Sequence, residues 1–434
     1  MNPSKSLAQW LAYIERQHPQ SIAMGLDRVR EVALRMGLQR PARKVISVAG
    51  TNGKGSTVAF IEAITRAAGW KVGAYTSPHL LAYNERVRID GRDAGDAELI
   101  EAFEAVEAAR TGPLIIPLTY FEYGTLAALW LFQRADLDLA VLEVGLGGRL
   151  DAVNLVDADV AVITTVDIDH QDYLGDEREA IGYEKAGIAR QWKPLVLGED
   201  DPPASVLRHA YAIGASTIRA NCDFFFETMV QQAQPDQPGN AWRWRELGYA
   251  LDLPNPQLPA PVQLRNAATA IAALRALGDP LPAAALAQGV ATAHVPGRLQ
   301  HCMHDGVEVV LDVGHNPQAA RELAAWLRQS RNPRTVGVFA ALGDKDLAGI
   351  VATVAEYIDG WLLAGLEDAG ARGLDIDTFA ARLEGTAAGT GARHRGVAQA
   401  LDAALAGARP GDRVLVFGSF HTVAAALVLL QGCH

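Results

Sequence analysis

Short apolar runs rich in β-branched residues alternate along the chain with longer Ala-, Leu-, Glu- and Arg-rich segments of helical period. This alternation is typical of strands and helices that build a parallel sheet. The pattern therefore predicts an α/β protein. The predicted strands cover residues 44–49, 71–76, 137–144, 159–166 and 193–198, and later 307–313, 335–342, 360–365 and 413–419.

Residues 221–263 break this rhythm, with the runs CDFFFE and AWRWRELGYALDL separated by a Gln/Pro-rich patch and followed by several prolines. We expect a small antiparallel insert there. Helical periodicity resumes in RNAATAIAALRALG, and HVPGRLQ at 294–300 is predicted to be a hinge. Because 434 residues exceed the usual domain size of about 150, we expect two domains, 1–295 and 296–434.

Composition narrows the partners and the compartment. The formal net charge of −11 disfavours a general binder of nucleic acid or of anionic membranes. Cys222, Cys302 and Cys433 are widely spaced and form no paired motif, which favours a reducing cytoplasm. The longest late apolar run, VAAALVLL, is far short of the roughly 20 residues that span a bilayer. We expect a cytoplasmic protein, monomeric because no assembly segment is evident.

Unusual loops follow successive predicted strands. In the first part of the chain these are GTNGKGS, SPHL, EVGLGG and DIDHQDYLG, and in the second part GHNP, GDKD and GSFHT. Ligands of open parallel sheets bind outside the carboxyl ends of the strands. We therefore expect the loops to converge at one edge of each domain, and the two edges to face each other across an active site.

The first of these loops, VAGTNGKGST, resembles a phosphate-binding loop with unusual spacing. Gly50 lies three residues before Gly53, and Gly55 separates Lys54 from Ser56, unlike the common P-loop. A strand, a glycine turn and a helix start would offer backbone N–H groups and the Lys54 cation to phosphate. The alternative is that these glycines only close a tight β–α turn.

Two further residues suggest a divalent cation. Glu143 ends an apolar strand and His170 lies in DIDHQD. One carboxylate and one imidazole, completed by hydroxyls and phosphate oxygens, would suit Mg²⁺. Each residue could instead be structural, the glutamate as a helix-terminus partner and the histidine as a core residue.

Taken together, these motifs resemble those of a known family. GTNGKGS, YTSPHL, NERVRI, LTYFEYGT, LEVGLGGRLDAVN, DHQDYLG, EKAGI, NAATA, PGR, DVGHNP and GSFHTV are similar to the folylpolyglutamate synthases, in their bacterial form that is also a dihydrofolate synthase, and more widely to the Mur ligases. The resemblance runs from about residue 10 to about residue 425. It implies an ATP-binding domain with a P-loop-type parallel sheet over 1–295 and a Rossmann-like ligase domain over 296–434.

The resemblance also implies a reaction. ATP would phosphorylate a substrate carboxylate to an acyl phosphate, and the amine of L-glutamate would attack it to form an amide. The acceptors would be dihydropteroate, which gives dihydrofolate, and tetrahydrofolate, whose γ-linked tail is extended. The cofactors would be ATP and Mg²⁺, with K⁺ as a monovalent ion. The alternatives are a folylpolyglutamate synthase only, a Mur-type peptide ligase of cell-wall synthesis, and an ATP-dependent binding module without ligation.

The family's ATP and metal residues carry over to positions that match its motifs. Lys54, Lys185 and His170 would be catalytic, with Lys185 carbamylated so that it becomes an anion that helps to hold Mg²⁺. The alternative for Lys185 is a surface lysine that pairs with Glu184 or snorkels over the helix. The residues implied for ATP are Gly50, Thr51, Asn52, Gly53, Lys54, Gly55, Ser56, Asn266, Arg298, Asp312 and His315, and those for the metal are Ser56, Ser77, Glu143, His170 and Lys185.

Substrate contacts are implied at four further places. In LTYFEYGT, Thr119 and Phe121 would line the pterin or benzoate part of the acceptor, and Asp151, after GGRL, would hydrogen-bond the pterin. Arg86 and Arg88 of NERVRI could face carboxylates, although a solvated β-ribbon is the alternative for both. Ser419 and His421 of GSFHTV are implied on the glutamate side.

Overall fold

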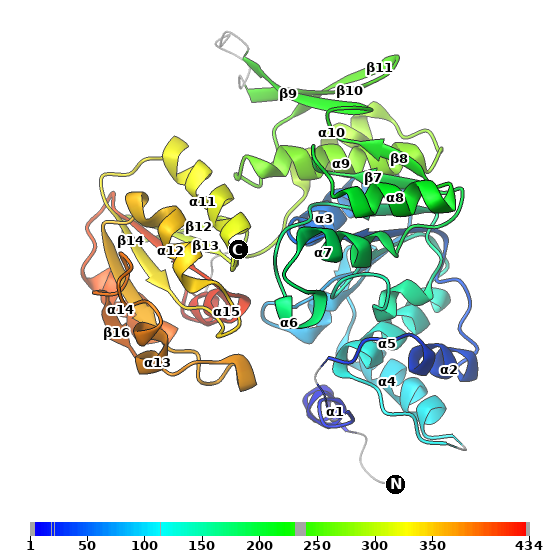
Figure 1. Ribbon diagram of the computed structural model, residues 1–434, viewed down its shortest axis with the longest axis horizontal. Coiled ribbons are helices and arrows are strands. Elements are labelled where there is room, and N and C mark those ends of the chain that lie inside the picture. Colours follow the sequence, from blue (N-terminus) through cyan, green and yellow to red (C-terminus); the bar gives the residue numbers. More distant parts are fainter. Residues whose placement is uncertain (1–4, 19, 21, 113, 231–239, 431–434) are drawn as a thin grey trace. The chain divides into compact units, whose positions relative to one another are not determined.

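The computed structural model describes residues 5–18, 20, 22–112, 114–230 and 240–430 (Figure 1). The chain divides into two compact units. The first comprises Met1–Gln257 and Leu264–His294, and the second comprises Leu258–Gln263 and Val295–His434. Within the described residues, no helix is long and apolar enough to cross a membrane.

The first unit is built on an eight-stranded sheet in the order β4-β3-β2-β5-β1-β6-β7-β8. Its central strands are parallel, and β3 and β4 extend one edge as an antiparallel ribbon. The register aligns Val48 of β1 with Glu143 of β5, so both strands end beside the loop that follows β1. The strands are β1 (Ala42–Ala49), β2 (Val72–Tyr75), β3 (Val87–Ile89), β4 (Arg92–Asp93), β5 (Leu137–Glu143), β6 (Val160–Ile163), β7 (Pro194–Leu197) and β8 (Ser216–Arg219).

Helices lie between these strands in the chain, as expected for parallel connections. They are α1 (Leu7–Ile14), α2 (Asp27–Arg35), α3 (Lys54–Ala67), α4 (Asp96–Arg110), α5 (Tyr120–Arg134), α6 (Gln171–Leu174), α7 (Arg178–Ala186), α8 (Ala204–Ile213), α9 (Val262–Ala276) and α10 (Ala283–Thr292), with short 3₁₀ turns η1 (Tyr83–Arg86) and η2 (Ala152–Leu155).

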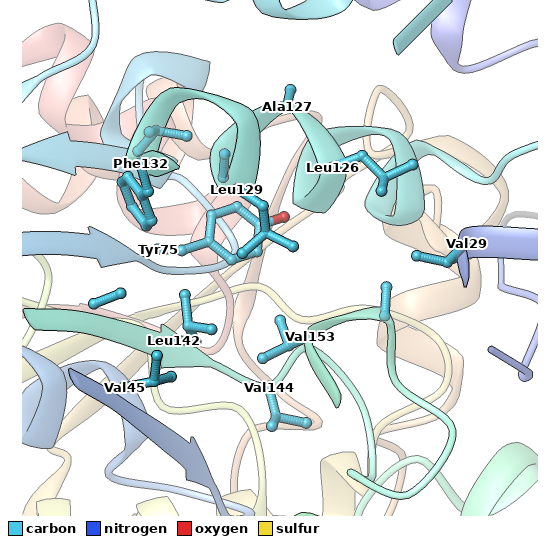
Figure 2. Packing of buried hydrophobic residues seen from close by; sticks show 14 of the residues in the cluster. Val29, Val45, Tyr75, Leu126, Ala127, Leu129, Phe132, Leu142, Val144 and Val153 are labelled. Atoms are coloured by element: carbon cyan, nitrogen blue, oxygen red, sulfur yellow. The ribbon is translucent and has the colours of Figure 1, made fainter. Parts of the chain in front are cut away.

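The core of the first unit lies between α5 and the sheet. Figure 2 shows Leu129 and Phe132 of α5 on the side of the helix that faces Tyr75 of β2 and Leu142 of β5. These four side chains are buried, and burying each aliphatic or aromatic side chain contributes about 1.5–3 kcal/mol. This packing holds the strands whose carboxyl ends carry the candidate site.

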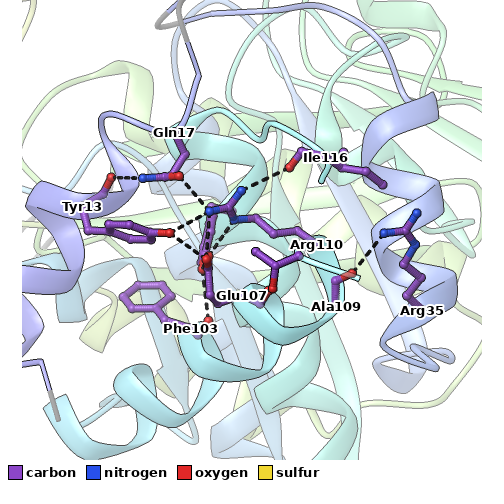
Figure 3. Close-up of polar contacts among 10 residues, drawn as sticks. Tyr13, Gln17, Arg35, Phe103, Glu107, Ala109, Arg110 and Ile116 are labelled. Atoms are coloured by element: carbon purple, nitrogen blue, oxygen red, sulfur yellow. Dashed lines mark hydrogen bonds and ion pairs between the residues drawn. The ribbon is translucent and has the colours of Figure 1, made fainter. Parts of the chain in front are cut away.

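A polar cluster connects the amino-terminal helix to α4 (Figure 3). The Tyr13 hydroxyl donates to Glu107 Oε1 at 2.6 Å, and Arg110 donates to Glu107 Oε2 at 2.6 Å and to Gln17 Oε1 at 2.7 Å. Tyr123 of α5 also donates to Glu107, at 2.8 Å. The single carboxylate of Glu107 therefore joins α1, α4 and α5.

The insert is a three-stranded antiparallel sheet, which confirms the prediction for this region. Its strands are β9 (Phe224–Val230), β10 (Asn240–Glu246) and β11 (Tyr249–Pro254). Trp242 and Trp244 are fully buried, and Trp244 Nε1 donates to the Ala268 carbonyl of α9 at 3.1 Å. The Gln/Pro-rich patch at 231–238 lies outside the described residues.

The second unit contains a six-stranded sheet in the order β12-β13-β17-β14-β15-β16, parallel except for β12. Phe339 and Phe417 stack in its core with ring centroids 4.9 Å apart. The strands are β12 (Gln300–His304), β13 (Val307–Asp312), β14 (Thr335–Phe339), β15 (Gly360–Ala364), β16 (Ala392–His394) and β17 (Arg413–Phe417). The helices are α11 (Pro317–Gln329), α12 (Leu347–Val354), α13 (Ile376–Ala381), α14 (Val397–Ala406) and α15 (Phe420–Leu429), with 3₁₀ turns η3 (Ala355–Tyr357) and η4 (Gly370–Arg372).

The two sheets confirm the predicted α/β fold class, and every predicted strand is present. Five short strands were not predicted: β3, β4, β8, β12 and β16. All five lie at or next to a sheet edge, where the chain needs few apolar residues and the apolar pattern is weak. Several predicted strands also end early, as β14 does at Phe339, because the chain leaves the sheet to form a loop.

Candidate active site

The loop after β1 requires glycine at two positions. Gly50 has φ +150°, and a Cβ atom there would lie 1.8 Å from Thr164 Oγ1. Gly53 has φ +86°, and a Cβ atom there would lie 2.6 Å from Asn266 Oδ1. Positive φ and close neighbours together exclude ordinary side chains. The structure thus brings Asn266 of α9, buried at 3% exposure, against the loop.

Backbone contacts fix this loop to the segment that follows β6. The Thr51 N–H donates to the Thr165 carbonyl at 2.8 Å, and the Asn52 N–H donates to Thr165 Oγ1 at 3.1 Å. Lys54 Nζ donates to the loop's own carbonyls of Gly50 at 3.0 Å and Thr51 at 3.2 Å. The Lys54 cation is therefore held over the loop, where it can meet a phosphate.

The helix that follows begins without a side-chain cap. α3 starts at Lys54, and its N-cap is Gly53, which has no side chain to bond the first-turn N–H groups. Uncapped N–H groups and the positive end of the helix dipole favour an anion at this point. Ser56, in the first turn, is 2% exposed.

Glu143 lies at the junction of three strand ends. Its Oε2 accepts a hydrogen bond from the Ser77 N–H at 3.2 Å, and a Cβ atom on Gly55 would lie 3.7 Å from the same oxygen. The predicted metal ligands Ser77 and Glu143 are thus adjacent, next to the first turn of α3 that contains Ser56. They converge because β5 lies between β1 and β2 in the sheet.

His170 begins α6 in the left-handed region, with φ +53°. Its N–H donates to Asp169 Oδ1 at 2.8 Å, which supports this uncommon backbone conformation. Among the described residues, no group of three or more His, Cys, Asp or Glu side chains is arranged to hold a metal. A cation at this edge would therefore need hydroxyl or phosphate oxygens beside Glu143 and His170, as Mg²⁺ sites commonly use.

Lys185 is buried in α7, at 3% exposure. Burial lowers the pKa of Lys185 to about 7, and the charge of Lys54 lowers it further, whereas the charges of Asp169, Glu199 and Asp151 oppose this. The alternative of an exposed lysine beside Glu184 is wrong, because Glu184 pairs with Arg149 at 2.8 Å. An amine that is partly neutral near pH 7 can react with CO₂, which a protonated lysine cannot.

Asp151 is buried at the start of η2. Its carboxylate accepts from the Val153 N–H and from the Leu146 N–H, both at 2.9 Å. The bond to Leu146 closes the glycine-containing loop 146–151. Burial raises the pKa of Asp151 to about 7, although these backbone hydrogen bonds and Lys54 lower it. Lys54, Asp151 and Lys185 thus share one electrostatic neighbourhood.

The motif LTYFEYGT forms the start of α5. Thr119 is its N-cap and accepts from the Glu122 N–H at 3.2 Å, while Glu122 accepts from the Thr119 N–H at 2.7 Å. The Phe121 ring packs against Gly145, since a Cβ atom on Gly145 would lie 2.6 Å from Phe121 Cζ. Thr119 therefore has a capping role, and Phe121 lies against the EVGLGG loop.

The two arginines of NERVRI differ. Arg88 pairs with Glu62 of α3 at 2.8 Å, and its side chain is 22% exposed. Arg86 is buried at 9% exposure, and its Nε donates to His79 Nδ1 at 2.8 Å. Its guanidinium lies 5.3 Å from the ring centroid of Tyr83.

In the second unit, Asp312 ends β13 and orders the loop after it. Its two oxygens accept from the Leu299 N–H at 3.0 Å and the Gly314 N–H at 2.8 Å. Burial raises the pKa of Asp312, against the opposing charges of Arg298 and His315. The three predicted ATP residues of this unit are therefore close enough to influence one another.

Ser419 and His421 lie at the start of α15. Ser419 is the N-cap, accepting from the Thr422 N–H at 3.0 Å. Burial lowers the pKa of His421, and the charge of Arg372 adds to this. The hydroxyl of Ser419 is thus engaged within its own helix.

Sequence reasoning missed the residues that brace the phosphate loop from β6. Thr165 and Asp167 hold Thr51 and Asn52, and Thr164 Oγ1 donates to the Asn52 carbonyl at 2.6 Å. The signal was the polar run TTVD directly after an apolar strand. It marks the carboxyl end of β6, next to β1.

Known proteins match both units. Residues 48–274 match the Mur ligase middle domain, and residues 297–420 match the Mur ligase glutamate ligase domain. The dihydrofolate synthase/folylpolyglutamate synthase of Escherichia coli strain K12 is 44% identical over 98% of this chain and 96% of its own length. The Haemophilus influenzae protein of the same name is 39% identical over 98% of this chain and 97% of its own length.

Solved structures agree with these relatives. E. coli FolC in complex with DHPP and ADP has a TM-score of 0.89 at 44% identity, covering 99% of this chain and 98% of its own. A bifunctional folylpolyglutamate synthase/dihydrofolate synthase with Mn, AMPPNP and L-glutamate bound has a TM-score of 0.88 at 44% identity, again covering 99% and 98%.

The two sheets and the phosphate-loop edge define an ATP-dependent ligase of the Mur type. Within that class, the chain belongs to the bifunctional dihydrofolate synthase/folylpolyglutamate synthase family.

Proposed function

We propose that this enzyme joins L-glutamate to dihydropteroate, and to tetrahydrofolate as γ-linked extensions, with ATP and Mg²⁺. The observation that carries the proposal is the match along almost the whole chain, at 44% identity, to a protein that bears both activities in its name. The ADP-, AMPPNP- and Mn-bound relatives support ATP and a divalent cation. A need for K⁺, a monomeric state and a cytoplasmic location are also part of the proposal.

In this reaction the chain's own groups would position phosphate and neutralise its charge. The backbone N–H groups of residues 50–56 would bind the β- and γ-phosphates, and Lys54 would exchange its loop carbonyls for phosphate oxygens. Positioning and charge neutralisation are the main tasks in phosphoryl transfer. The side chains of Arg298, Asp312 and His315 are proposed to hold ATP from the second unit.

The donor set fits Mg²⁺. Ser56, Ser77, Glu143 and His170 would supply hydroxyl, carboxylate and imidazole ligands, and Lys185 would supply a carbamate oxygen. When bound, the cation would lower the charge on the transferred phosphoryl group. The close approach of Glu143 Oε2 to the Ser77 N–H and to Gly55 supports this assignment.

The acceptor would lie near the start of α5 and the EVGLGG loop. Phe121 and Thr119 would line it, Asp151 would bond its pterin, and buried Arg86 would attract a carboxylate. On the glutamate side, His421 is proposed to contact the amino acid, with Ser419 acting through the helix that it caps.

The test is ligation with radiolabelled glutamate, comparing dihydropteroate with tetrahydrofolate as acceptor. We expect product with both, and ATP hydrolysis that depends on glutamate and acceptor together. Product with tetrahydrofolate alone would reduce the function to polyglutamate synthesis. ATP turnover indifferent to both substrates would exclude a ligase.

A further inference from the structure

An ion pair outside the residues assigned so far encloses one peptide of the segment that follows β6. Arg178, the first residue of α7, donates from Nη2 to Glu199 Oε2 at 2.9 Å and from Nε to the Val166 carbonyl at 2.8 Å. Burial raises the pKa of Glu199, and the charge of Arg178 opposes this. The ion pair thus holds Val166 through its carbonyl oxygen.

Val166 lies between the two residues that hold the phosphate loop. Thr165 accepts from the Thr51 N–H at 2.8 Å, and the Asp167 N–H donates to Thr51 Oγ1 at 3.0 Å. The loop after β1 therefore contacts residues 165 and 167, and the ion pair holds residue 166 between them.

The chemistry suits a clamp. Hydrogen bonds with a charged partner are about twice as strong as neutral ones. The planar guanidinium of Arg178 can donate to Val166 and Glu199 at once, which a lysine cannot. The pair therefore restrains the segment whose neighbouring residues hold the loop after β1.

We infer that Arg178 and Glu199 are positioning residues that hold residues 164–167 in register with the phosphate loop, and so preorganise the loop for nucleotide phosphates. The inference rests on the proposed function only in taking this loop to bind the phosphates of ATP. Neither residue needs to touch the nucleotide.

The experiment measures ADP binding in the presence of Mg²⁺ by calorimetry. Glu199→Gln keeps the shape of the side chain but removes the negative charge that pairs with the Arg178 guanidinium. Because the apparent affinity falls with the fraction of competent loop, we expect the Kd for ADP to rise about tenfold. The KM for ATP should rise with it, while the KM for dihydropteroate stays unchanged.

Two variants guard against a general loss of structure. Arg178→Lys keeps the charge beside Glu199 but offers one nitrogen, and should weaken ADP binding by a smaller factor. Asp252→Asn breaks an exposed ion pair with Arg243 in the insert sheet and should leave ADP binding unchanged. Circular dichroism and thermal unfolding establish that each variant is folded.

Unchanged ADP affinity in folded Glu199→Gln and Arg178→Lys would overturn the inference, as would an equal loss in Asp252→Asn. If Glu199→Gln does not fold, Arg178→Lys decides alone. A wild-type protein that binds ADP but ligates no glutamate would defeat the proposed function and leave this inference to the ADP measurements.

Discussion

The carboxyl edges of the two sheets use their buried charges differently. At the edge of the eight-stranded sheet, Lys185 and Asp151 both have pKa values shifted to about 7 by burial, in opposite directions. At the edge of the six-stranded sheet, Asp312 and Ser419 accept hydrogen bonds from backbone N–H groups that are close to them in the sequence. Asp151 orders a loop as Asp312 does, but at the first edge this carboxyl group lies with an amine whose pKa is likewise close to neutral pH.

The difference indicates where reacting atoms and where binding contacts belong. Strongly shifted pKa values cluster at catalytic sites, because burial and neighbouring charges are arranged there for chemistry. Local caps set the shape of a binding edge without taking part in the reaction. Substitutions at the first edge should therefore reduce turnover, and those at the second should change stability or affinity.

The largest effect is expected at Lys185. Without its carbamate, Lys185→Ala should lose more than about 100-fold in turnover, since even the partners of metal ligands are worth about 10–100-fold. Added short carboxylic acids should partly restore Lys185→Ala by supplying the missing anion, but not Lys185→Arg, which keeps a cation.

The measurement is the ligation rate with and without formate or acetate. Lys193→Ala, which removes a half-exposed lysine paired with Asp159, is the matched control and should retain wild-type activity. Wild-type activity of Lys185→Ala without added acid would show that the first edge does not depend on this residue.

The next effect concerns Glu143→Ala and His170→Ala. Each should remove most turnover while thermal unfolding stays close to wild type, because each deletes a proposed ligand beside the transferred phosphoryl group. The rate is measured across a Mg²⁺ titration, with His209→Ala of α8 as the control histidine. Full activity of either variant at limiting Mg²⁺ would contradict the assigned metal site.

Asp151 should give the first edge a specific pH dependence. Its folded pKa of about 7 is raised above the ordinary 3.8, so its contribution to stability is fully present below about pH 4 and is lost as the pH rises through about 7. Asp151→Asn cannot ionise and should gain relative to wild type over this window, by at most about 1.4 kcal/mol per pH unit.

The check is denaturant unfolding of both proteins at several pH values from 4 to 8. Asparagine has one acceptor oxygen fewer than aspartate, which shifts the unfolding free energy by the same amount at every pH. Only the change of the free-energy difference with pH is therefore informative. Asp157→Asn, at a side chain that is 81% exposed, is the control for replacing an exposed carboxylate. If the free-energy difference between Asp151→Asn and wild type does not change with pH, burial does not raise the pKa of the Asp151 carboxyl group.

The smallest effect separates two neighbours in the second unit. Ser419→Ala removes an N-cap and should cost about 1 kcal/mol in unfolding free energy, with little change in the KM for glutamate. His421→Ala should raise the KM for glutamate and leave stability nearly unchanged. Both variants are measured by denaturant unfolding and steady-state kinetics. A raised KM for glutamate in Ser419→Ala with unchanged stability would instead assign Ser419 to the glutamate-binding site.

Much of the fold was determined by local pattern. The apolar runs predicted every central strand because a buried parallel strand needs apolar residues on both faces. Gly50 and Gly53 were recognisable because few side chains tolerate their positive φ. The edge strands were not, since their apolar pattern is weak, and the Arg88–Glu62 pair was not, since its partners are 26 residues apart.

By itself, the sequence determined the α/β class, the glycine-rich loop after β1 and the family, because these depend on residue type and on short spacing. Tertiary structure alone decided the burial of Lys185, which turns an ordinary surface cation into an amine with a pKa of about 7. It also decided that Arg178 and Glu199 meet around Val166. Burial and long-range contact depend on how the sheet orders its strands, with β6 between β1 and β7, and no local pattern contains that order.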